Sequence, residues 1–289
     1  MRYVDTLKRP EKPMDVRVIV MSASRSGTLA TYRALNKLGF EAYHNHKSFA
    51  YGASHMKMFN EALQAAWHEN TEAYHRPEFD KWFQGYDALV ELPSYFPEEI
   101  VQAYPGAKYI LVERDPTAWA RSVMNSIVRM ADDVNKMPIR TLKHFDETMK
   151  MLCINARLIG GHFSGGHFTR QGGLEACETW ALTDRTSTAR IDSLLRVKKL
   201  VPAEQLLVLR LEDGLDWHSI CPFLQLPLPQ EPWPEKNTCE QFHTLVQELM
   251  TPLVKRALVR AITYALLLAV IVLFHRLAEL RTLVGNVIQ

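Results

Sequence analysis

Short apolar runs, many of them rich in β-branched residues, recur along the chain and alternate with longer segments of helical periodicity. The runs cover residues 16–21, 40–43, 87–92, 108–114 and 206–209. Their length and composition are typical of buried strands. Strands that alternate with helices are joined by right-handed crossovers and form a parallel sheet with helices on both faces. The pattern therefore predicts an α/β fold.

The segments between these runs predict the helices. Apolar residues recur at helical spacing after residue 28 until Gly39 ends the pattern. Further helices are predicted at residues 53–67, 97–104, 141–159 and 174–199, and from residue 116 onward. Residues 160–173 are rich in glycine and histidine, and we expect a flexible loop there. Residues 226–237 hold four prolines and predict a loop without regular structure.

Composition and charge narrow the class of protein. The 289 residues are 47% hydrophobic and 23% charged, which is typical of a packed globular chain. The 34 Lys and Arg residues against 32 Asp and Glu residues leave a net charge of +2, too even for the basic stripe of a nucleic-acid binder. We therefore expect no nucleic-acid partner. The four cysteines include no CxxC pair, so we expect reduced thiols and no metal site.

The two ends of the chain differ from its middle. Residues 1–13 hold no apolar core of a secretory signal, and we expect residues 1–15 to form an N-terminal extension of an α/β domain at 16–245. Residues 246–289 form a helical tail, in which 261–274 carries no charge. Extended to 257–275, this segment predicts a single membrane span that anchors a cytosolic catalytic domain. A buried core helix is the alternative reading.

A polar turn lies between the first predicted strand and the first predicted helix. It consists of Ser24, Arg25, Ser26, Gly27 and Thr28. Backbone N–H groups and the helix dipole favour an anion at such a turn, and Arg25 adds a cation whose planar fork fits tetrahedral oxyanions. The chain contains no GxxxxGK[ST] motif, which holds a magnesium-bound triphosphate in P-loop enzymes. The turn therefore predicts an anion site of another kind.

A second candidate anion site begins at the end of the fourth predicted strand. Arg114 leaves the sheet at its carboxyl edge, where ligands bind in open α/β folds. Ser122 follows about two helical turns later, so its hydroxyl can face the same pocket. Two anion sites on neighbouring crossovers predict a nucleotide that is phosphorylated at two positions.

The order and spacing of these motifs resemble the sulfotransferase family. Residues 24–28 are similar to the family's 5′-phosphosulfate loop, in which cytosolic members have Lys in place of Arg25. Arg114 with Ser122 is similar to the family's 3′-phosphate motif, although we find no Arg-Lys-Gly segment of the kind that completes it. Residues 206–217, 221–229 and 233–237 resemble a divergent branch common in fungi.

The resemblance implies a P-loop NTPase-like sulfotransferase fold. It implies transfer of a sulfuryl group from 3′-phosphoadenosine 5′-phosphosulfate (PAPS) to a hydroxyl of a small metabolite, lipophilic acceptors included. Residues 24–28, Arg114 and Ser122 would bind the donor, and Arg25 would also stabilise the leaving group. No metal is expected, because positioning and oxyanion stabilisation can suffice. A P-loop kinase or hydrolase, and a catalytically silent, membrane-tethered nucleotide-binding protein, stay open as alternatives.

The acceptor hydroxyl also needs a group that takes its proton, and two residues are candidates. Glu91 ends the third predicted strand and resembles an acidic position of the divergent branch. His44 follows the second predicted strand, and histidine is well suited to proton transfer near neutral pH. We further expect Trp119 to pack its helix on the sheet. For Lys236 and Asn237, closure over the site and an ordinary loop contact are both open.

Overall fold

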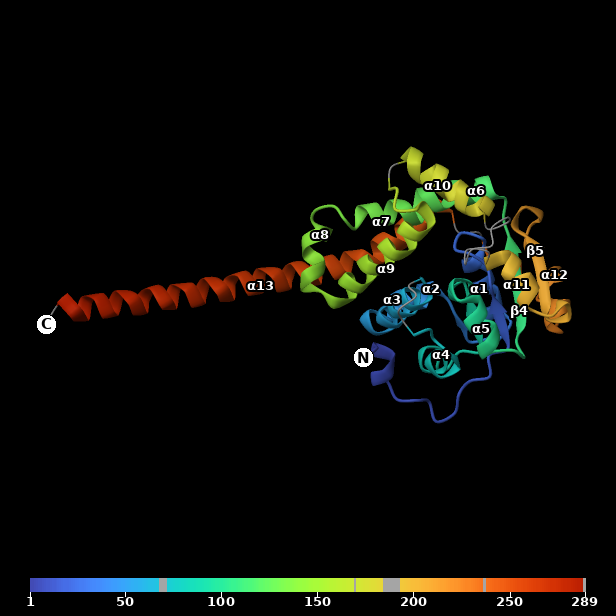
Figure 1. Ribbon diagram of the computed structural model, residues 1–289, viewed down its shortest axis with the longest axis horizontal. Coiled ribbons are helices and arrows are strands. Elements are labelled where there is room, and N and C mark those ends of the chain that lie inside the picture. Colours follow the sequence, from blue (N-terminus) through green and yellow to red (C-terminus); the bar gives the residue numbers. More distant parts are fainter. Residues whose placement is uncertain (68–71, 169, 184–192, 236–237, 288–289) are drawn as a thin grey trace.

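A five-stranded parallel sheet forms the centre of the protein (Figure 1). The computed structural model describes residues 1–67, 72–168, 170–183, 193–235 and 238–287. The strands are β1 (Val18–Val20), β2 (Ala42–Tyr43), β3 (Ala88–Val90), β4 (Lys108–Glu113) and β5 (Leu206–Arg210), in the order β2-β3-β1-β4-β5. Each strand overlaps one predicted run, and all neighbours pair in parallel. The predicted α/β fold is confirmed.

Both faces of the sheet are buried along β1 to β3 and the middle of β4, which explains why these segments are apolar, whereas the edge strand β5 is partly exposed. Val18 and Val20 of β1 point to a core that includes Leu35 of α1 (Thr28–Lys37) and Ile220 of α12 (Trp217–Leu224). Ile19, between them, points to the opposite and larger core. That core is covered by α3 (Ala53–Trp67), α4 (Arg76–Trp82), α5 (Pro97–Ala103), α6 (Pro116–Val123) and α9 (Glu147–Ser164) among others.

The remaining helices are mostly short and connect these layers. The α-helices are α2 (Asn45–Tyr51), α7 (Arg129–Asp133), α8 (Ile139–Leu142), α10 (Arg170–Thr183) and α11 (Ser193–Leu200). Single-turn elements are η1 (Tyr3–Thr6), η2 (Leu92–Tyr95), η3 (Met124–Val128), η4 (Lys143–Phe145), η5 (Ala203–Gln205) and η6 (Leu211–Asp213). Residues 226–235 hold no helix or strand, in agreement with the proline pattern; 236–237 lie outside the described residues.

The flexible loop predicted at residues 160–173 is wrong for most of its length. α9 continues to Ser164, and α10 begins at Arg170. Gly160 lies inside α9, where a Cβ atom would approach the Cβ atom of Ala131 on α7 to 2.5 Å. This glycine therefore permits two helices to pack closely, and of the described residues in the segment only 165–168 lie outside a helix. The helix predicted at 141–159 is likewise divided, because Asp146 caps the start of α9.

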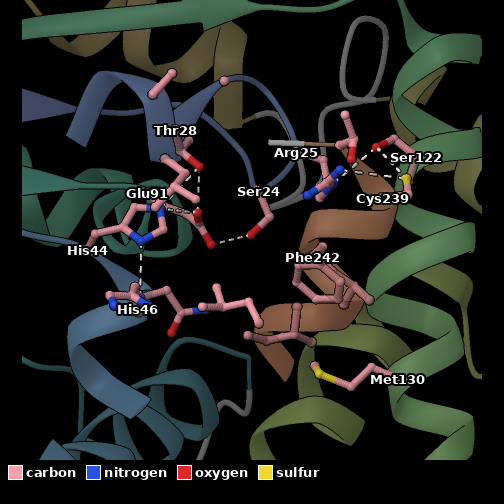
Figure 2. A pocket seen from close by; sticks show the side chains of 18 of the residues that line it. Ser24, Arg25, Thr28, His44, His46, Glu91, Ser122, Met130, Cys239 and Phe242 are labelled. Atoms are coloured by element: carbon pink, nitrogen blue, oxygen red, sulfur yellow. Dashed lines mark hydrogen bonds and ion pairs between the residues drawn. The ribbon is translucent and has the colours of Figure 1, made fainter. Parts of the chain in front are cut away.

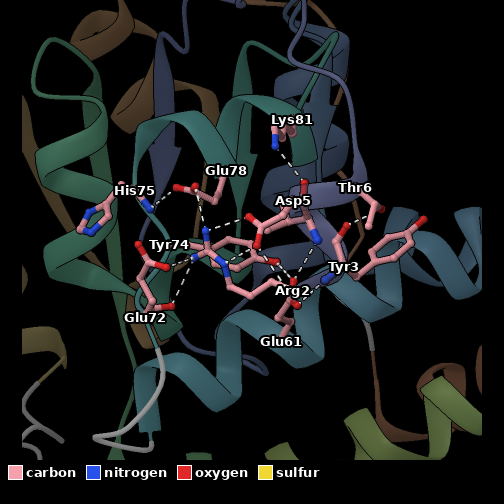
Figure 3. Close-up of polar contacts among 11 residues, drawn as sticks. Arg2, Tyr3, Asp5, Thr6, Glu61, Glu72, Tyr74, His75, Glu78 and Lys81 are labelled. Carbon is pink, nitrogen blue, oxygen red and sulfur yellow. Dashed lines mark hydrogen bonds and ion pairs between the residues drawn. The ribbon is translucent and has the colours of Figure 1, made fainter.

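The N-terminal segment packs on the domain (Figure 3). The Glu61 carboxylate on α3 accepts hydrogen bonds from the backbone N–H groups of Tyr3 (2.6 Å) and Val4 (3.2 Å). Val4 is fully buried in the larger core. Arg2 forms ion pairs with Asp5 and with other carboxylates of the domain. These contacts fix the first turn of the chain against α3 and α4.

The last helix, α13 (Cys239–Val287), begins inside the domain and then leaves it (Figure 1). Its first part packs on α8, η4 and α9 through Met250 and Ala257. Arg256 and Arg260 form ion pairs with the buried side chain of Asp146. From residue 258 onward the described apolar side chains are largely exposed. α13 is long and apolar enough to cross a membrane.

Candidate functional site

The site lies at the carboxyl edge of the sheet, where the strand order reverses. From β1 in the middle, the chain continues to β2 and β3 on one side and to β4 and β5 on the other. Ligands bind at such a switch point in open parallel sheets. The turn after β1 and the ends of β3 and β4 meet here, so the fold brings the predicted motifs together.

The turn after β1 is shaped by Gly27, the N-cap of α1. Its φ angle is 78°, which disfavours every residue with a Cβ atom. A Cβ atom at this position would also lie 3.0 Å from the side chains of Leu211 and Leu215. The N–H groups in the first turn of α1 have no acceptor inside the helix, and with the helix dipole they favour a bound anion.

A cavity of about 340 Å³ lies beside this turn (Figure 2). Its volume is in the range of small-molecule sites. Eight of the residues predicted from the sequence line it, namely Ser24, Arg25, Gly27, Thr28, His44, Glu91, Arg114 and Ser122. Ser26 is buried but does not line the cavity wall. Within the part of the chain that the structure describes, no group of three or more His, Cys, Asp or Glu residues is placed to hold a metal ion.

One side of the cavity is cationic. Arg25 donates from Nε to Ser122 Oγ at 3.1 Å, so the two predicted anion sites are in direct contact. Arg114 donates from Nη1 to the carbonyl oxygen of Arg25. Burial, and then repulsion from Arg25, lowers the pKa of the Arg114 guanidinium. Two neighbouring guanidinium groups of this kind are stabilised when an anion binds between them.

The two candidate proton acceptors form one pair. His44 Nε2 lies 2.9 Å from Glu91 Oε2. The same carboxylate accepts hydrogen bonds from Ser24 Oγ and Thr28 Oγ1, both at 2.6 Å. Since Ser24 gives its only hydrogen to Glu91, it accepts from the hydroxyl of Tyr95 at 2.8 Å. From the sequence, Glu91 and His44 are alternative candidates for the proton acceptor. In the structure, the order of the strands places them side by side (Figure 2).

The hydrogen bonds fix the protonation of this pair. His44 Nδ1 accepts from the backbone N–H of His46 at 3.0 Å, so the proton of the neutral ring sits on Nε2 and is donated to Glu91. Burial alone would raise the pKa of Glu91. The imidazole of His44 and the hydrogen bonds from Ser24 and Thr28 outweigh it and lower the pKa to about 2. Glu91 is therefore a buried carboxylate at neutral pH.

Backbone strain marks the same two places. Among the described residues, three non-glycine residues have a positive φ angle: Arg25, Glu91 and Gln225. Gln225 caps the end of α12, where a left-handed residue is common. Arg25 (φ 70°) lies in a turn closed by the Ser26 N–H and the Ala23 carbonyl oxygen at 3.2 Å, at the position where a type II turn requires a positive φ angle. Glu91 (φ 73°) lies directly between the end of β3 and the start of η2. Non-glycine residues held in this conformation cluster at functional sites, because the surrounding structure must compensate for their strain.

Other predicted residues support the site or lie elsewhere. Trp119 is buried in the larger core, as expected, and its Nε1 also donates to the carbonyl oxygen of Ser24 at 2.9 Å. It therefore holds the anion-binding turn against α6. Lys236 and Asn237 lie outside the described residues.

Sequence reasoning missed the far wall of the cavity. Asn155 on α9 and Cys239 and Phe242 on α13 line it. Cys239 Sγ lies 3.6 Å from Arg25 Nη2, and the Phe242 ring centroid lies 5.3 Å from the Arg25 guanidinium carbon. These residues stand far from the motifs in sequence and carry only helical periodicity there. Tertiary packing alone brings them to the site.

Comparisons with known proteins identify the family of the chain. Residues 17–242 match a family model described as a sulfotransferase domain. The chain is also 26% identical over 230 residues to Ava biosynthesis cluster protein M of Aspergillus versicolor, an alignment that covers 78% of this chain and 82% of that protein. The matched residues include the turn after β1, the Glu91–His44 pair and the Arg114 and Ser122 positions. The chain therefore belongs to the sulfotransferase family.

Proposed function

We propose that this protein transfers a sulfuryl group from PAPS to the hydroxyl of a small metabolite. The observation that carries the proposal is the composition of one cavity, which has two arginines at one side and a buried, ionised carboxylate at the other. The first group suits a doubly phosphorylated nucleotide, and the second suits the proton of an attacking hydroxyl.

Donor binding uses the residues that follow β1 and β4. Bound PAPS supplies the sulfuryl group and a good leaving group, adenosine 3′,5′-bisphosphate. Arg25 and the N–H groups at the start of α1 stabilise charge on the 5′-phosphate side. Arg114 and Ser122 hold the 3′-phosphate. When this phosphate binds, it replaces the hydrogen bond between Arg25 and Ser122 that is present in the free protein. Neutralisation by this phosphate offsets the desolvation and repulsion that lower the pKa of Arg114.

Glu91 receives the acceptor proton, and His44 positions it. Both ring nitrogens of His44 are engaged, one by the His46 backbone and one by Glu91. A carboxylate offers about four acceptor positions, of which Ser24, Thr28 and His44 use three. The fourth is available to the acceptor hydroxyl. Negative charge on the bound donor raises the pKa of Glu91 and makes it a better base than it is in the free protein.

The reaction forms one bond to sulfur, breaks another and transfers one proton. The acceptor oxygen forms a bond to sulfur while the bond from sulfur to the 5′-phosphate oxygen breaks. The hydroxyl proton moves to Glu91 and then leaves to solvent after product release. Arg25 stabilises the phosphate oxygen that gains charge.

A turnover assay tests the proposal. We expect the purified chain, supplied with PAPS and a panel of phenols and alcohols, to release adenosine 3′,5′-bisphosphate only when an acceptor is present. Chromatography resolves that product from PAPS. Acceptor-dependent release with sulfur on the acceptor supports the proposal. If the donor binds and no acceptor of the panel is sulfated, the catalytically silent alternative is favoured.

We also propose that α13 is a membrane anchor for a cytosolic domain. Residues 257–275 span about 28 Å as a helix, close to the thickness of the apolar core of a bilayer. Leu245, at the cavity, is 13 residues before Leu258 on the same helix, or about 20 Å. Because α13 lines the cavity and also crosses the membrane, it sets the distance of the cavity from the membrane surface.

Truncation of α13 tests this anchor. We expect a chain ending at residue 262 to be soluble without detergent and as stable as the full chain, because it keeps the ion pairs of Arg256 and Arg260 with Asp146. A chain ending at residue 252 loses Leu253, Val254 and Ala257 from an apolar cluster, and it loses both arginine partners of Asp146. Its free energy of unfolding should fall by about 2 to 4 kcal/mol. Denaturant titration compares the two. Aggregation of the 262-residue chain would favour a buried helix.

A further inference from the structure

Unpartnered polar atoms are concentrated in the wall of the cavity. Among the described residues, four buried side-chain nitrogen or oxygen atoms have no hydrogen-bond partner: Asn45 Oδ1, His46 Nδ1, Asn60 Oδ1 and Asn155 Nδ2. Asn45, His46 and Asn155 line the cavity. Asn60 does not, and its amide nitrogen is bound to the Met151 carbonyl oxygen at 2.9 Å. Buried polar groups are nearly always paired, so a ligand is the natural partner for those in the wall.

Asn155 is the most informative of these residues. It lies on α9 and is 1% exposed, and its Nδ2 is a donor without an acceptor. Ala156 and Ile159 of the same helix also line the cavity and are apolar. A buried donor between apolar neighbours favours a ligand with an oxygen acceptor at that point, because an apolar ligand would leave the donor unpaired.

Several apolar side chains accompany Asn155 in the cavity wall. Phe49, Met130 and Phe242 belong to it, and Figure 2 shows Met130 and Phe242 on the side of the cavity away from His44. Burial lowers the pKa of His46, which keeps that ring neutral near pH 7. Such a wall suits a neutral ligand and disfavours one with a charged group.

We propose that the acceptor is a neutral, largely apolar hydroxy compound with a carbonyl-type oxygen that accepts a hydrogen bond from Asn155. The hydroxyl faces Glu91, and the carbonyl oxygen lies on the α9 side. This inference rests on the proposed function for the identity of the reacting group, while the Asn155 contact itself is a matter of binding alone.

Two probes of equal shape test this contact. 4-Hydroxybenzophenone and 4-benzylphenol are both phenols, and they differ in having a carbonyl or a methylene group between the rings. We expect the ketone to bind roughly tenfold more tightly to the full chain, measured by calorimetry with and without adenosine 3′,5′-bisphosphate. Asn155→Leu should abolish the difference. Asn60→Leu, which changes a buried asparagine outside the cavity, should retain it.

The ketone also allows a test on the unaltered protein. On irradiation, its excited carbonyl takes a hydrogen atom from a nearby C–H group, and the two carbon radicals join while the carbonyl becomes an alcohol. We expect mass spectrometry to map the new bond to α9 or to the first turns of α13. This result does not depend on the folding of any variant.

The outcomes separate the two claims. Equal affinity of the two probes for the unaltered chain, a preference that survives Asn155→Leu, or cross-links confined to residues 23–28 would overturn the inference about Asn155. Failure of adenosine 3′,5′-bisphosphate to bind would instead count against the proposed function. The probe comparison without nucleotide decides the Asn155 contact in that case as well.

Discussion

Glu91→Gln is expected to lower turnover about 10³-fold while leaving nucleotide affinity within about threefold. Glutamine keeps the shape of the side chain but lacks the negative charge and cannot take the acceptor proton. The loss should appear in kcat more than in KM, because the group acts on the reacting atoms. Single-turnover kinetics with PAPS and a phenol that is sulfated measure the change. Near-normal turnover would remove Glu91 from the mechanism.

His44→Gln is the informative companion to that variant. His44 lowers the pKa of Glu91 through the hydrogen bond from its Nε2, so its removal should raise that pKa. We expect kcat/KM of the unaltered chain to show no acid limb between pH 5 and 8, because the pKa of Glu91 is about 2 in the free protein. In His44→Gln, the loss of kcat/KM on acidification should begin at a higher pH than in the unaltered chain. An inflection near pH 6.5 in the unaltered chain, lost with His44, would instead make His44 the base.

Arg114→Ala is expected to weaken binding of adenosine 3′,5′-bisphosphate about 100-fold and binding of adenosine 5′-monophosphate less than threefold. The variant removes a guanidinium that contacts the 3′-phosphate, so only a nucleotide that carries this phosphate loses a contact. Calorimetric titration of both nucleotides gives the comparison. Arg121→Ala is the matched control, because Arg121 is exposed on the same α6 helix that carries Ser122 and does not line the cavity. Equal loss for both nucleotides would place Arg114 outside the 3′-phosphate site.

The strands were predictable because a parallel sheet buried on both faces leaves a strong local signal. Val18, Ile19 and Val20 are all buried, so the run is apolar at every position, whereas a surface helix alternates apolar and polar faces. The loop prediction at residues 160–173 was wrong for a physical reason. Gly160 reads as flexibility in the sequence, but in the structure it is the contact that lets α9 approach Ala131. Composition does not distinguish these two uses of glycine.

The anion-binding half of the site was also predictable, since Arg25 and Arg114 lie in motifs tied to strand ends. The pairing of Glu91 with His44 was not, because it depends on β2 and β3 being neighbours in the sheet. Asn155 and Phe242 were out of reach for the same reason. They face the cavity only after α9 and α13 have packed, and nothing local to either helix marks them.

The most direct test of the account is a calorimetric titration of the full chain with adenosine 3′,5′-bisphosphate, adenosine 5′-monophosphate and magnesium ATP. We expect the bisphosphate to bind at least about tenfold more tightly than either of the others, because Arg25 and Arg114 are arranged for phosphates at two positions. Magnesium ATP that binds as tightly as the bisphosphate, or tighter, would contradict the account.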